Sequence, residues 1–248
     1  MRLLALLTAL SLLSPYAEAA RCKKNKIVKI AVVDSGFGWN ERGHGAKLCK
    51  YGHKDFSSDH QLTGSFDTKD PVPLDTMGHG TNIVGIIDDQ LKKTNLNYCI
   101  VVIKYYSVNQ SGEMNLNASI KAFQYAVNLN VDYINYSGGG DNFSVEESNV
   151  VKKYLDKGGR LIAAAGNDGR DLTLGSYYPA MYDKRIIVVG NRTADGVRSV
   201  LSNYGSPVNR WEVGENVKAY GITLTGTSQA TAAATGKIVS ESKCDTRN

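Results

Sequence analysis

Short runs of apolar, β-branched residues alternate along the chain with longer stretches whose apolar residues recur at helical spacing. Continuous apolar runs of this kind are typical of strands buried on both faces. Because such alternation favours a parallel sheet covered by helices, the sequence predicts a three-layer α/β fold with a mostly parallel central sheet flanked by helices. The predicted strands are 29–33, 100–103, 131–136, 161–165 and 186–189, and the predicted helices are 81–91, 116–129, 145–155 and a small-residue run from Ser228 onward.

The first residues have a different character from the rest. Arg2 precedes an apolar run at residues 3–13, and the small residues Ala17 and Ala19 offer a cleavage point. This order is typical of a secretory signal peptide, and the run is shorter than the roughly 20 apolar residues that span a bilayer. We expect residues 1–19 to be a signal peptide, residues 20–248 to form one domain, and the mature monomer to be secreted or periplasmic without a membrane partner.

Composition excludes some partners. The 248 residues are 42% hydrophobic, enough for one sizeable core, and the net charge of +5 is only mildly basic. Basic residues are scattered in pairs and form no long run with interleaved aromatics, so we expect no nucleic-acid partner.

Four cysteines form an even set in a chain that we expect to be exported. Cys22, Cys49, Cys99 and Cys244 would make two disulfides with three alternative connectivities, among which the sequence does not choose. A bond between Cys22 and Cys244 would restrain both ends of the chain, and we keep it as a hypothesis.

Three segments bear the residue types of nucleophilic catalysis. Asp34 ends an apolar strand, His79 lies between two glycines at the start of an apolar helix, and Ser228 opens a helix of small residues. Taken alone, the aspartate and the serine could each be a turn or cap residue. Together they supply a nucleophile, a base and an orienting acid. His44 also lies between glycines, but no apolar helix follows, so we interpret it as a loop histidine.

These segments resemble the signatures of the subtilase family: Asp-Ser-Gly after a strand, Gly-His-Gly-Thr opening a helix, and Gly-Thr-Ser before small residues, in the order Asp, His, Ser. The resemblance implies a serine endopeptidase that hydrolyses a polypeptide substrate through an acyl-enzyme intermediate. Asp34, His79 and Ser228 would be its catalytic triad, and no cofactor would be required.

Two further segments extend the resemblance. Asn167, in Ala-Ala-Gly-Asn after a strand, matches the family's oxyanion-hole asparagine, and Tyr-Ser-Gly-Gly-Gly at 136–140 resembles the edge that pairs with an extended substrate. The substrate-binding candidates are Ser137, Gly138, Gly139, Ala164 and Gly166.

The chain departs from the family pattern at several points. Gln229 and Ala232 replace a methionine and a proline of the usual serine segment, and Asn82 replaces a second histidine. We expect a short form without a prodomain, which folds unaided or with an external chaperone. Residues 88–97 show no recognisable calcium loop, and we expect Asp88 and Asp89 to cap or solvate a helix end. A structural calcium site elsewhere in the chain stays open but has no support in the sequence.

Two alternatives remain. The departures leave open a catalytically silent peptide-binding protein with a subtilase-like fold. A cluster of potential ligands could instead hold zinc, although its spacing matches no zinc motif and a cysteine in an exported protein is usually oxidised. The cluster comprises His44, Cys49, His53 and His60, with Asp55 and Asp59 nearby.

Overall fold

The central sheet of the protein is parallel throughout. The computed structural model describes residues 26–39, 45–60, 62–63 and 66–242, so the predicted signal peptide, His44, Cys22 and Cys244 lie outside the described residues. The sheet has seven strands in the order β2-β5-β1-β6-β7-β8-β9, and every neighbouring pair is parallel. The strands are β1 (Val28–Asp34), β2 (Lys54–Asp55), β5 (Tyr98–Lys104), β6 (Tyr133–Tyr136), β7 (Arg160–Ala164), β8 (Ile187–Arg192) and β9 (Arg210–Val213).

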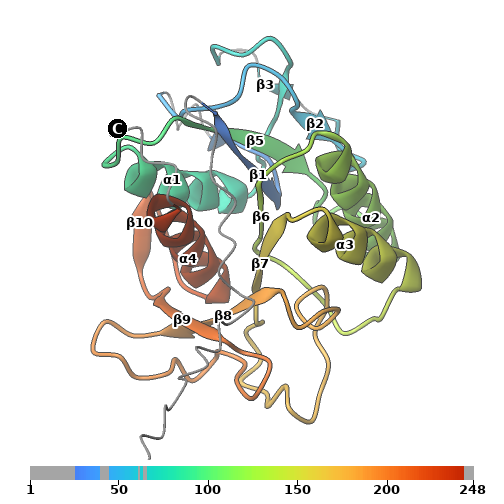
Figure 1. Cartoon of the computed structure of the whole chain (residues 1–248), viewed down its shortest axis with the longest axis vertical. Coiled ribbons are helices and arrows are strands. Elements are labelled where there is room, and N and C mark those ends of the chain that lie inside the picture. Colours follow the sequence, from blue (N-terminus) through green and yellow to red (C-terminus); the bar gives the residue numbers. More distant parts are fainter. Residues whose placement is uncertain (1–25, 40–44, 61, 64–65, 243–248) are drawn as a thin grey trace, which may run out of the picture.

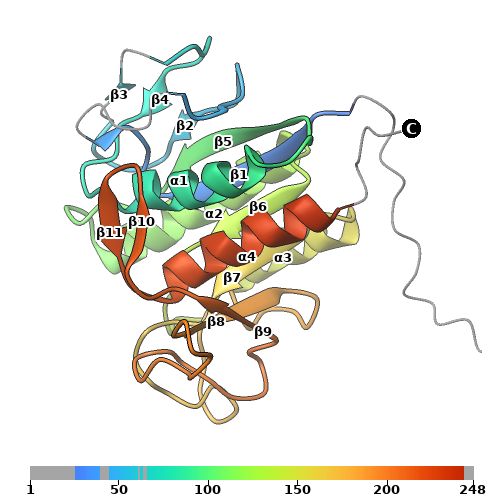
Figure 2. The same cartoon turned by 90° about the vertical axis from the view of Figure 1, so that its left-hand side faces the viewer.

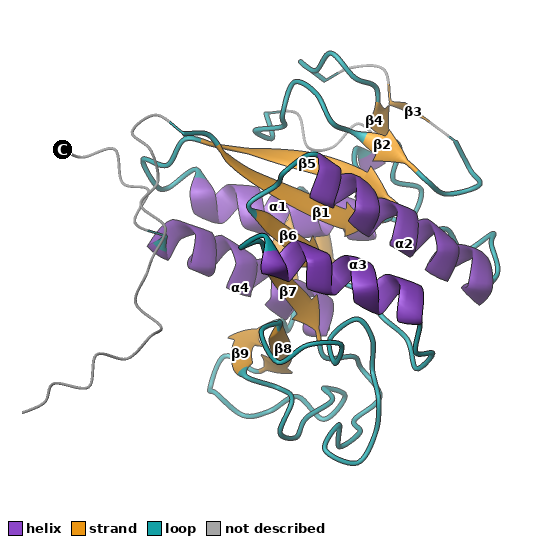
Figure 3. Ribbon diagram, turned by 45° about the vertical axis from the view of Figure 1, so that its right-hand side comes forward, coloured by secondary structure: helices purple, strands orange, loops and turns teal. Residues whose placement is uncertain are grey.

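Helices cover both faces of the sheet. Helices α1 (His79–Leu91) and α4 (Thr227–Glu241) lie side by side on one face, and α2 (Gly112–Asn128) and α3 (Val145–Asp156) lie on the other (Figure 1, Figure 3). The prediction of a three-layer α/β fold is therefore confirmed. None of the helices in the described part of the chain combines the length and the apolar character needed to cross a bilayer.

Each face of the sheet has its own hydrophobic core, and the four apolar residues 30–33 of β1 contribute to both cores. Ala31 and Val33 pack into the cluster under α2 and α3, whereas Ile30 and Val32 pack into the cluster under α1 and α4. Successive strand residues point to opposite faces, so a strand that is covered on both sides needs an apolar residue at every position.

The element ends differ from the predicted ones by a few residues. Helix α2 begins at Gly112 and not at 116, because the side chain of Ser111 caps it by accepting a hydrogen bond from the N–H of Met114 (3.2 Å). The sequence did not reveal the shortest strands, since two or three residues show no periodicity. Those outside the central sheet are β3 (Leu62–Thr63), β4 (Val72–Pro73), β10 (Val217–Ala219) and β11 (Ile222–Leu224).

The antiparallel pair of β10 and β11 packs against α1, as Figure 2 shows. The side-chain amide of Asn82 on α1 donates hydrogen bonds to the carbonyl groups of Val217 (3.3 Å) and Ile222 (2.9 Å). This pair of strands leads directly into α4, so its contact with α1 helps to fix where α4 begins.

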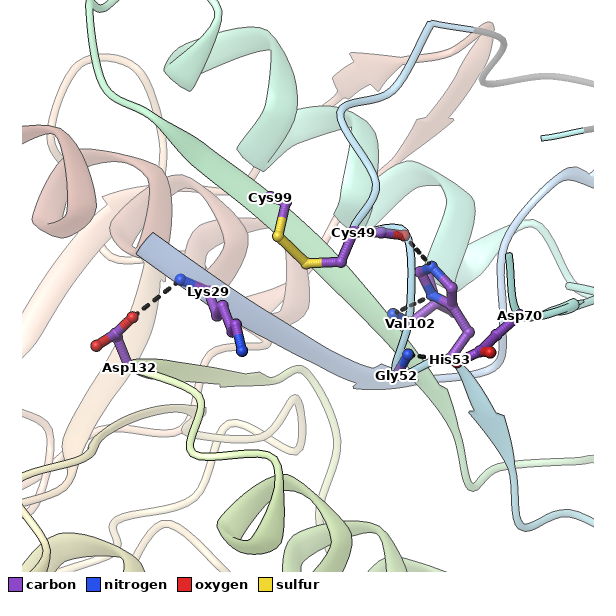
Figure 4. The surroundings of a disulfide bond; sticks show 8 residues. All are labelled: Lys29, Cys49, Gly52, His53, Asp70, Cys99, Val102 and Asp132. Carbon is purple, nitrogen blue, oxygen red and sulfur yellow. Dashed lines mark hydrogen bonds between the residues drawn. A yellow bond between two sulfur atoms is a disulfide. The ribbon is translucent and has the colours of Figure 1, made fainter. Parts of the chain in front are cut away.

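A disulfide joins Cys49 to Cys99 on β5 (Figure 4). Beside it, both ring nitrogens of His53 are occupied: Nε2 lies 2.7 Å from the carbonyl oxygen of Cys49, and Nδ1 accepts from the N–H of Val102 at 3.1 Å. Burial lowers the pKa of His53, which keeps the ring neutral. Two members of the suggested zinc cluster are thus engaged in other bonds, and the described residues contain no group of three metal-ligand side chains.

We predict that the double variant Cys49→Ala/Cys99→Ala is less stable than the native protein. The bond links residues 50 positions apart, so its loss enlarges the unfolded ensemble and should lower the free energy of unfolding by about 2–4 kcal/mol. Urea unfolding of both proteins without reductant measures the difference. Equal free energies of unfolding would show that the bond contributes nothing.

Candidate active site

Seven of the nine predicted site residues line one cavity at the carboxyl edge of the sheet. Asp34 is the last residue of β1, Ser137 follows β6, and Asn167 follows β7. His79 and Ser228 lie in the first turns of α1 and α4. Parallel strands end at the same edge, which explains why these distant segments meet. The cavity measures about 590 Å³, and its walls include Asp34, His79, Ser137, Asn167 and Ser228.

Asp34 and His79 are joined by a hydrogen bond. The Nδ1 atom of His79 lies 2.7 Å from Oδ1 of Asp34, whose side chain is only 5% exposed. Burial alone would lower the pKa of His79, but the charge of Asp34 and this hydrogen bond outweigh it and raise the pKa above its ordinary value. A carboxylate only accepts, so Nδ1 carries the proton and Nε2 of the neutral ring is the free acceptor.

This contact requires two glycines. A Cβ atom at position 80 would lie 2.2 Å from the carbonyl oxygen of Gly36, and Gly36 itself adopts a φ of +111°, in the left-handed region. The turn after β1 and the first turn of α1 can therefore approach closely enough for Asp34 to reach His79.

Asp75 holds the loop that presents His79, and the sequence did not single it out. The carboxylate is 1% exposed and accepts five hydrogen bonds at 2.7–2.9 Å. An aspartate often begins a turn by accepting from the backbone N–H groups two and three residues later. Asp75 accepts in this way from Met77 and Gly78, so this turn pattern could have revealed it. The donors are the N–H groups of Met77, Gly78 and Thr81 and the hydroxyls of Ser35 and Thr81.

The hydroxyl of Ser228 points to a backbone carbonyl. It donates to the oxygen of Ser137 at 2.9 Å, and the hydroxyl of Ser137 donates to the carbonyl of Ser228 at 3.0 Å. Within the described residues no hydrogen bond joins Ser228 to His79, although both line the cavity. The structure thus bonds two of the three predicted residues to each other and places the third in the same cavity.

Asn167 is oriented by the residue that precedes the serine. Its Oδ1 atom accepts from the N–H of Thr227 at 2.8 Å, so its amide NH₂ is the end left to donate. The hydroxyl of Thr227 accepts in turn from the N–H of Gly166 at 3.2 Å. Two backbone-linked contacts therefore fix the segment after β7 against the start of α4.

The predicted substrate-binding residues divide into two groups. Ser137, Gly138 and Gly139 line the cavity, whereas Ala164 and Gly166 are not among its lining residues in the described part of the chain. The ring of Tyr177 lies close to two of the glycines: a Cβ atom at Gly139 or Gly166 would lie 2.4 or 2.9 Å from it. Tyr177 lies in a loop without periodicity, so no sequence pattern marks its position.

Comparison with known proteins identifies the family. Residues 25–240 match the profile of the subtilase family. The chain belongs to the subtilase family. It is 28% identical to the major intracellular serine protease of Bacillus subtilis (strain 168), over 88% of this chain and 69% of that protein. A crystal structure of a cold-adapted subtilisin-like serine proteinase matches with a TM-score of 0.66 and 26% identity, over 84% of this subtilase and 72% of that chain. The enzyme class implied by family membership is serine-type peptide hydrolase.

The relatives differ in length and location. This subtilase is also 28% identical to the minor extracellular protease Epr of Bacillus subtilis (strain 168), over 83% of its own length but only 30% of that protein. The matching relatives therefore include both an intracellular and an extracellular protease.

We predict that Asp75→Asn weakens both the fold and the site. An amide cannot accept all the hydrogen bonds that the carboxylate accepts, so the free energy of unfolding should fall by roughly 2–3 kcal/mol. Displacement of His79 should lower kcat/KM for a peptide by about 10- to 100-fold. Urea unfolding and peptide hydrolysis measure these effects. Asp89→Asn, at an exposed position on α1, is the control and should change neither quantity.

Proposed function

We propose that this subtilase is a secreted serine endopeptidase in which Asp34, His79 and Ser228 form the catalytic triad. The observation that carries the proposal is the hydrogen bond between Asp34 and His79 (2.7 Å) at the wall of the cavity that also contains Ser228. An imidazole held by a carboxylate on one side has its other nitrogen available to accept a proton from a nucleophile.

The proposed reaction begins with a rotation of the Ser228 side chain. Its hydroxyl leaves the carbonyl of Ser137 for another staggered position and donates to Nε2 of His79. Apo sites often show catalytic hydrogen bonds that are absent or long until substrate arrives. Oγ then attacks the scissile carbonyl carbon while its proton passes to Nε2, and Asp34 stabilises the resulting imidazolium.

The tetrahedral intermediate carries a negative oxygen. In this proposal the amide NH₂ of Asn167 and the backbone N–H of Ser228 donate to it. The imidazolium of His79 then protonates the leaving amine, and the C–N bond breaks to give the acyl-enzyme. A water molecule attacks the ester, with His79 again as the base, and the acid product and the free hydroxyl of Ser228 are regenerated.

The backbone of the Gly-rich segment supports a polypeptide as the substrate. The N–H and C=O groups of Gly138 and Gly139 make no hydrogen bond to other backbone groups in the described part of the chain, whereas Gly140 is paired with Tyr178 at 2.8 and 2.9 Å. An extended peptide could add to the unpaired edge as a strand. Ser137, Ala164 and Gly166 would be the further substrate-binding residues of this proposal.

We propose secretion after removal of residues 1–19, action as a monomer on polypeptides, and catalysis without a cofactor, a nucleic acid or a membrane. The second candidate is a catalytically silent peptide-binding protein. The observation in its favour is that the hydroxyl of Ser228 is bonded to Ser137 and not to His79.

We predict that the protein hydrolyses an unfolded polypeptide and that Ser228→Ala abolishes this activity. A fluorophosphonate probe should label the native protein at Ser228 only. Ser240→Ala, which removes an exposed hydroxyl from the same helix, is the matched control and should retain full activity. A folded native sample that is neither labelled nor active would favour the silent binding protein.

We predict that hydrolysis is lost as the pH falls through the raised pKa of His79, because only the neutral imidazole accepts a proton. In Asp34→Asn the charge that raises this pKa is absent, so the pKa should fall and the acid limb should move to lower pH. By analogy with other triads, the rate should fall about 10⁴-fold.

Ring-proton NMR of His79 provides a direct test of this pH dependence. The chemical shift is followed against pH in Ser228→Ala, with and without Asp34→Asn. An unchanged or higher pKa of His79 after removal of the Asp34 carboxylate would contradict the prediction.

A further inference from the structure

A second carboxylate lines the same cavity, away from the proposed triad. Glu147 lies in the first turn of α3 and is 2% exposed. It forms part of the cavity wall together with Ser119 on α2 and the Gly-rich segment after β6. The proposed mechanism gives Glu147 no role, and buried carboxylates are rare unless they are paired with a cation or perform a function.

The hydrogen-bond partners of Glu147 are neutral. Oε1 accepts a short hydrogen bond from the hydroxyl of Ser119, and Oε2 accepts from the hydroxyl of Tyr182 at 2.8 Å. Burial raises the pKa of Glu147, and the two hydroxyls only partly oppose this effect. No ion pair joins Glu147 to a lysine or arginine within the described residues.

The orientation of Glu147 departs from the usual local arrangement. Ser144 caps α3 by accepting from the N–H of Glu147 at 3.2 Å, which is half of a capping box. In a full capping box the glutamate would accept from the N–H of Ser144, but that N–H donates to the hydroxyl of Tyr182 at 3.2 Å. Tyr182 takes over the capping contact, and the carboxylate of Glu147 instead accepts from the hydroxyls of Ser119 and Tyr182.

The cavity wall has acidic side chains but no lysine or arginine among the described residues. The two carboxylates are those of Asp34 and Glu147. His79 partners Asp34, so Glu147 remains without a positive partner. The aromatic rings of Tyr105 and Tyr136 also line the cavity and stack at 5.0 Å between centroids. Such rings suit the hydrocarbon stem of a long basic side chain.

We propose that Glu147 determines specificity by binding a cationic side chain, lysine or arginine, of the polypeptide substrate. The inference rests on the proposed peptidase function. When the cation enters, the carboxylate is ionised, and the hydroxyls of Ser119 and Tyr182 continue to donate to it. An endopeptidase of this kind cuts near a basic residue that occupies the Glu147 side of the cavity.

The competing explanation is that Glu147 only fastens α3 to Ser119 and Tyr182. The variant Glu147→Gln separates the two explanations, because a glutamine has the same shape and can bond both hydroxyls but carries no charge. Glu146→Gln is the matched control, since it removes an exposed carboxylate from the same turn of α3. Thermal unfolding of both variants reports any structural effect separately.

The test compares kcat/KM for peptides that carry lysine or its uncharged acetylated form at each position around the cleaved bond. The native protein and Glu146→Gln should prefer lysine at one position by roughly 10- to 100-fold. The preference should fall to within about threefold in Glu147→Gln. A native protein that hydrolyses these peptides without preferring lysine, or a Glu147→Gln variant that keeps the preference, would overturn the proposal.

Binding of a small cation tests the same site without turnover. Benzamidinium should bind the native protein at least about 10-fold more tightly than neutral benzamide does, and Glu147→Gln should lose this difference, as measured by calorimetry. If the protein fails to hydrolyse any peptide but still binds benzamidinium through Glu147, the proposed reaction is wrong and the cation site stands. Equal binding of the two probes by the native protein would remove the cation site.

Discussion

The site depends on the close approach of the turn after β1 to the first turn of α1. Gly36 and Gly80 meet where a single Cβ atom would collide with a backbone oxygen. Only this approach brings Asp34 and His79, 45 residues apart, within hydrogen-bond distance. The hydroxyl of Ser35 reinforces it, because it accepts from the N–H of Gly80 and donates to Asp75. The distance between acid and imidazole is thus set by backbone packing and not by flexible side chains.

The parallel sheet adds the other components to this pair. Strand β6 pairs with β1 and β7 pairs with β6, all parallel, so Ser137 and Asn167 reach the same edge as Asp34. Helix α4 begins there because its first turn is bonded to both segments: Ser228 to Ser137 and Thr227 to Asn167. The start of α4, which contains Ser228, is therefore positioned by Asn167 and by Ser137. A displacement of any one of these segments would displace the other two.

The sequence predicted those features that follow from chemistry or burial at single positions. Continuous apolar runs predicted the strands, and the fixed order of Asp34, His79 and Ser228 predicted which segments meet. Features that depend on distant partners were not predictable. Asp88 was expected to cap or solvate a helix end, and this was wrong: it is fully buried, accepts from the hydroxyls of Tyr98 (2.8 Å) and Tyr220 (2.5 Å), and pairs with Lys92. Tyr177 likewise lies in a loop without periodicity, and Glu147, although it lies in a predicted helix, is oriented by the distant hydroxyls of Ser119 and Tyr182.

Two departures from the family pattern compensate each other. The side-chain amide of Gln229 donates to Oδ1 of Asn82 at 3.1 Å, and both residues are buried. The amide of Asn82 bonds the strands β10 and β11, so this contact ties the start of α4 to α1. Replacing either residue alone with an apolar one would leave a buried amide unpaired, at a cost of about 1–3 kcal/mol. The two positions therefore form one polar unit beneath the nucleophile candidate. Because neither amide gains or loses a proton at neutral pH, this unit preserves the position of Ser228 without altering the proposed proton transfer.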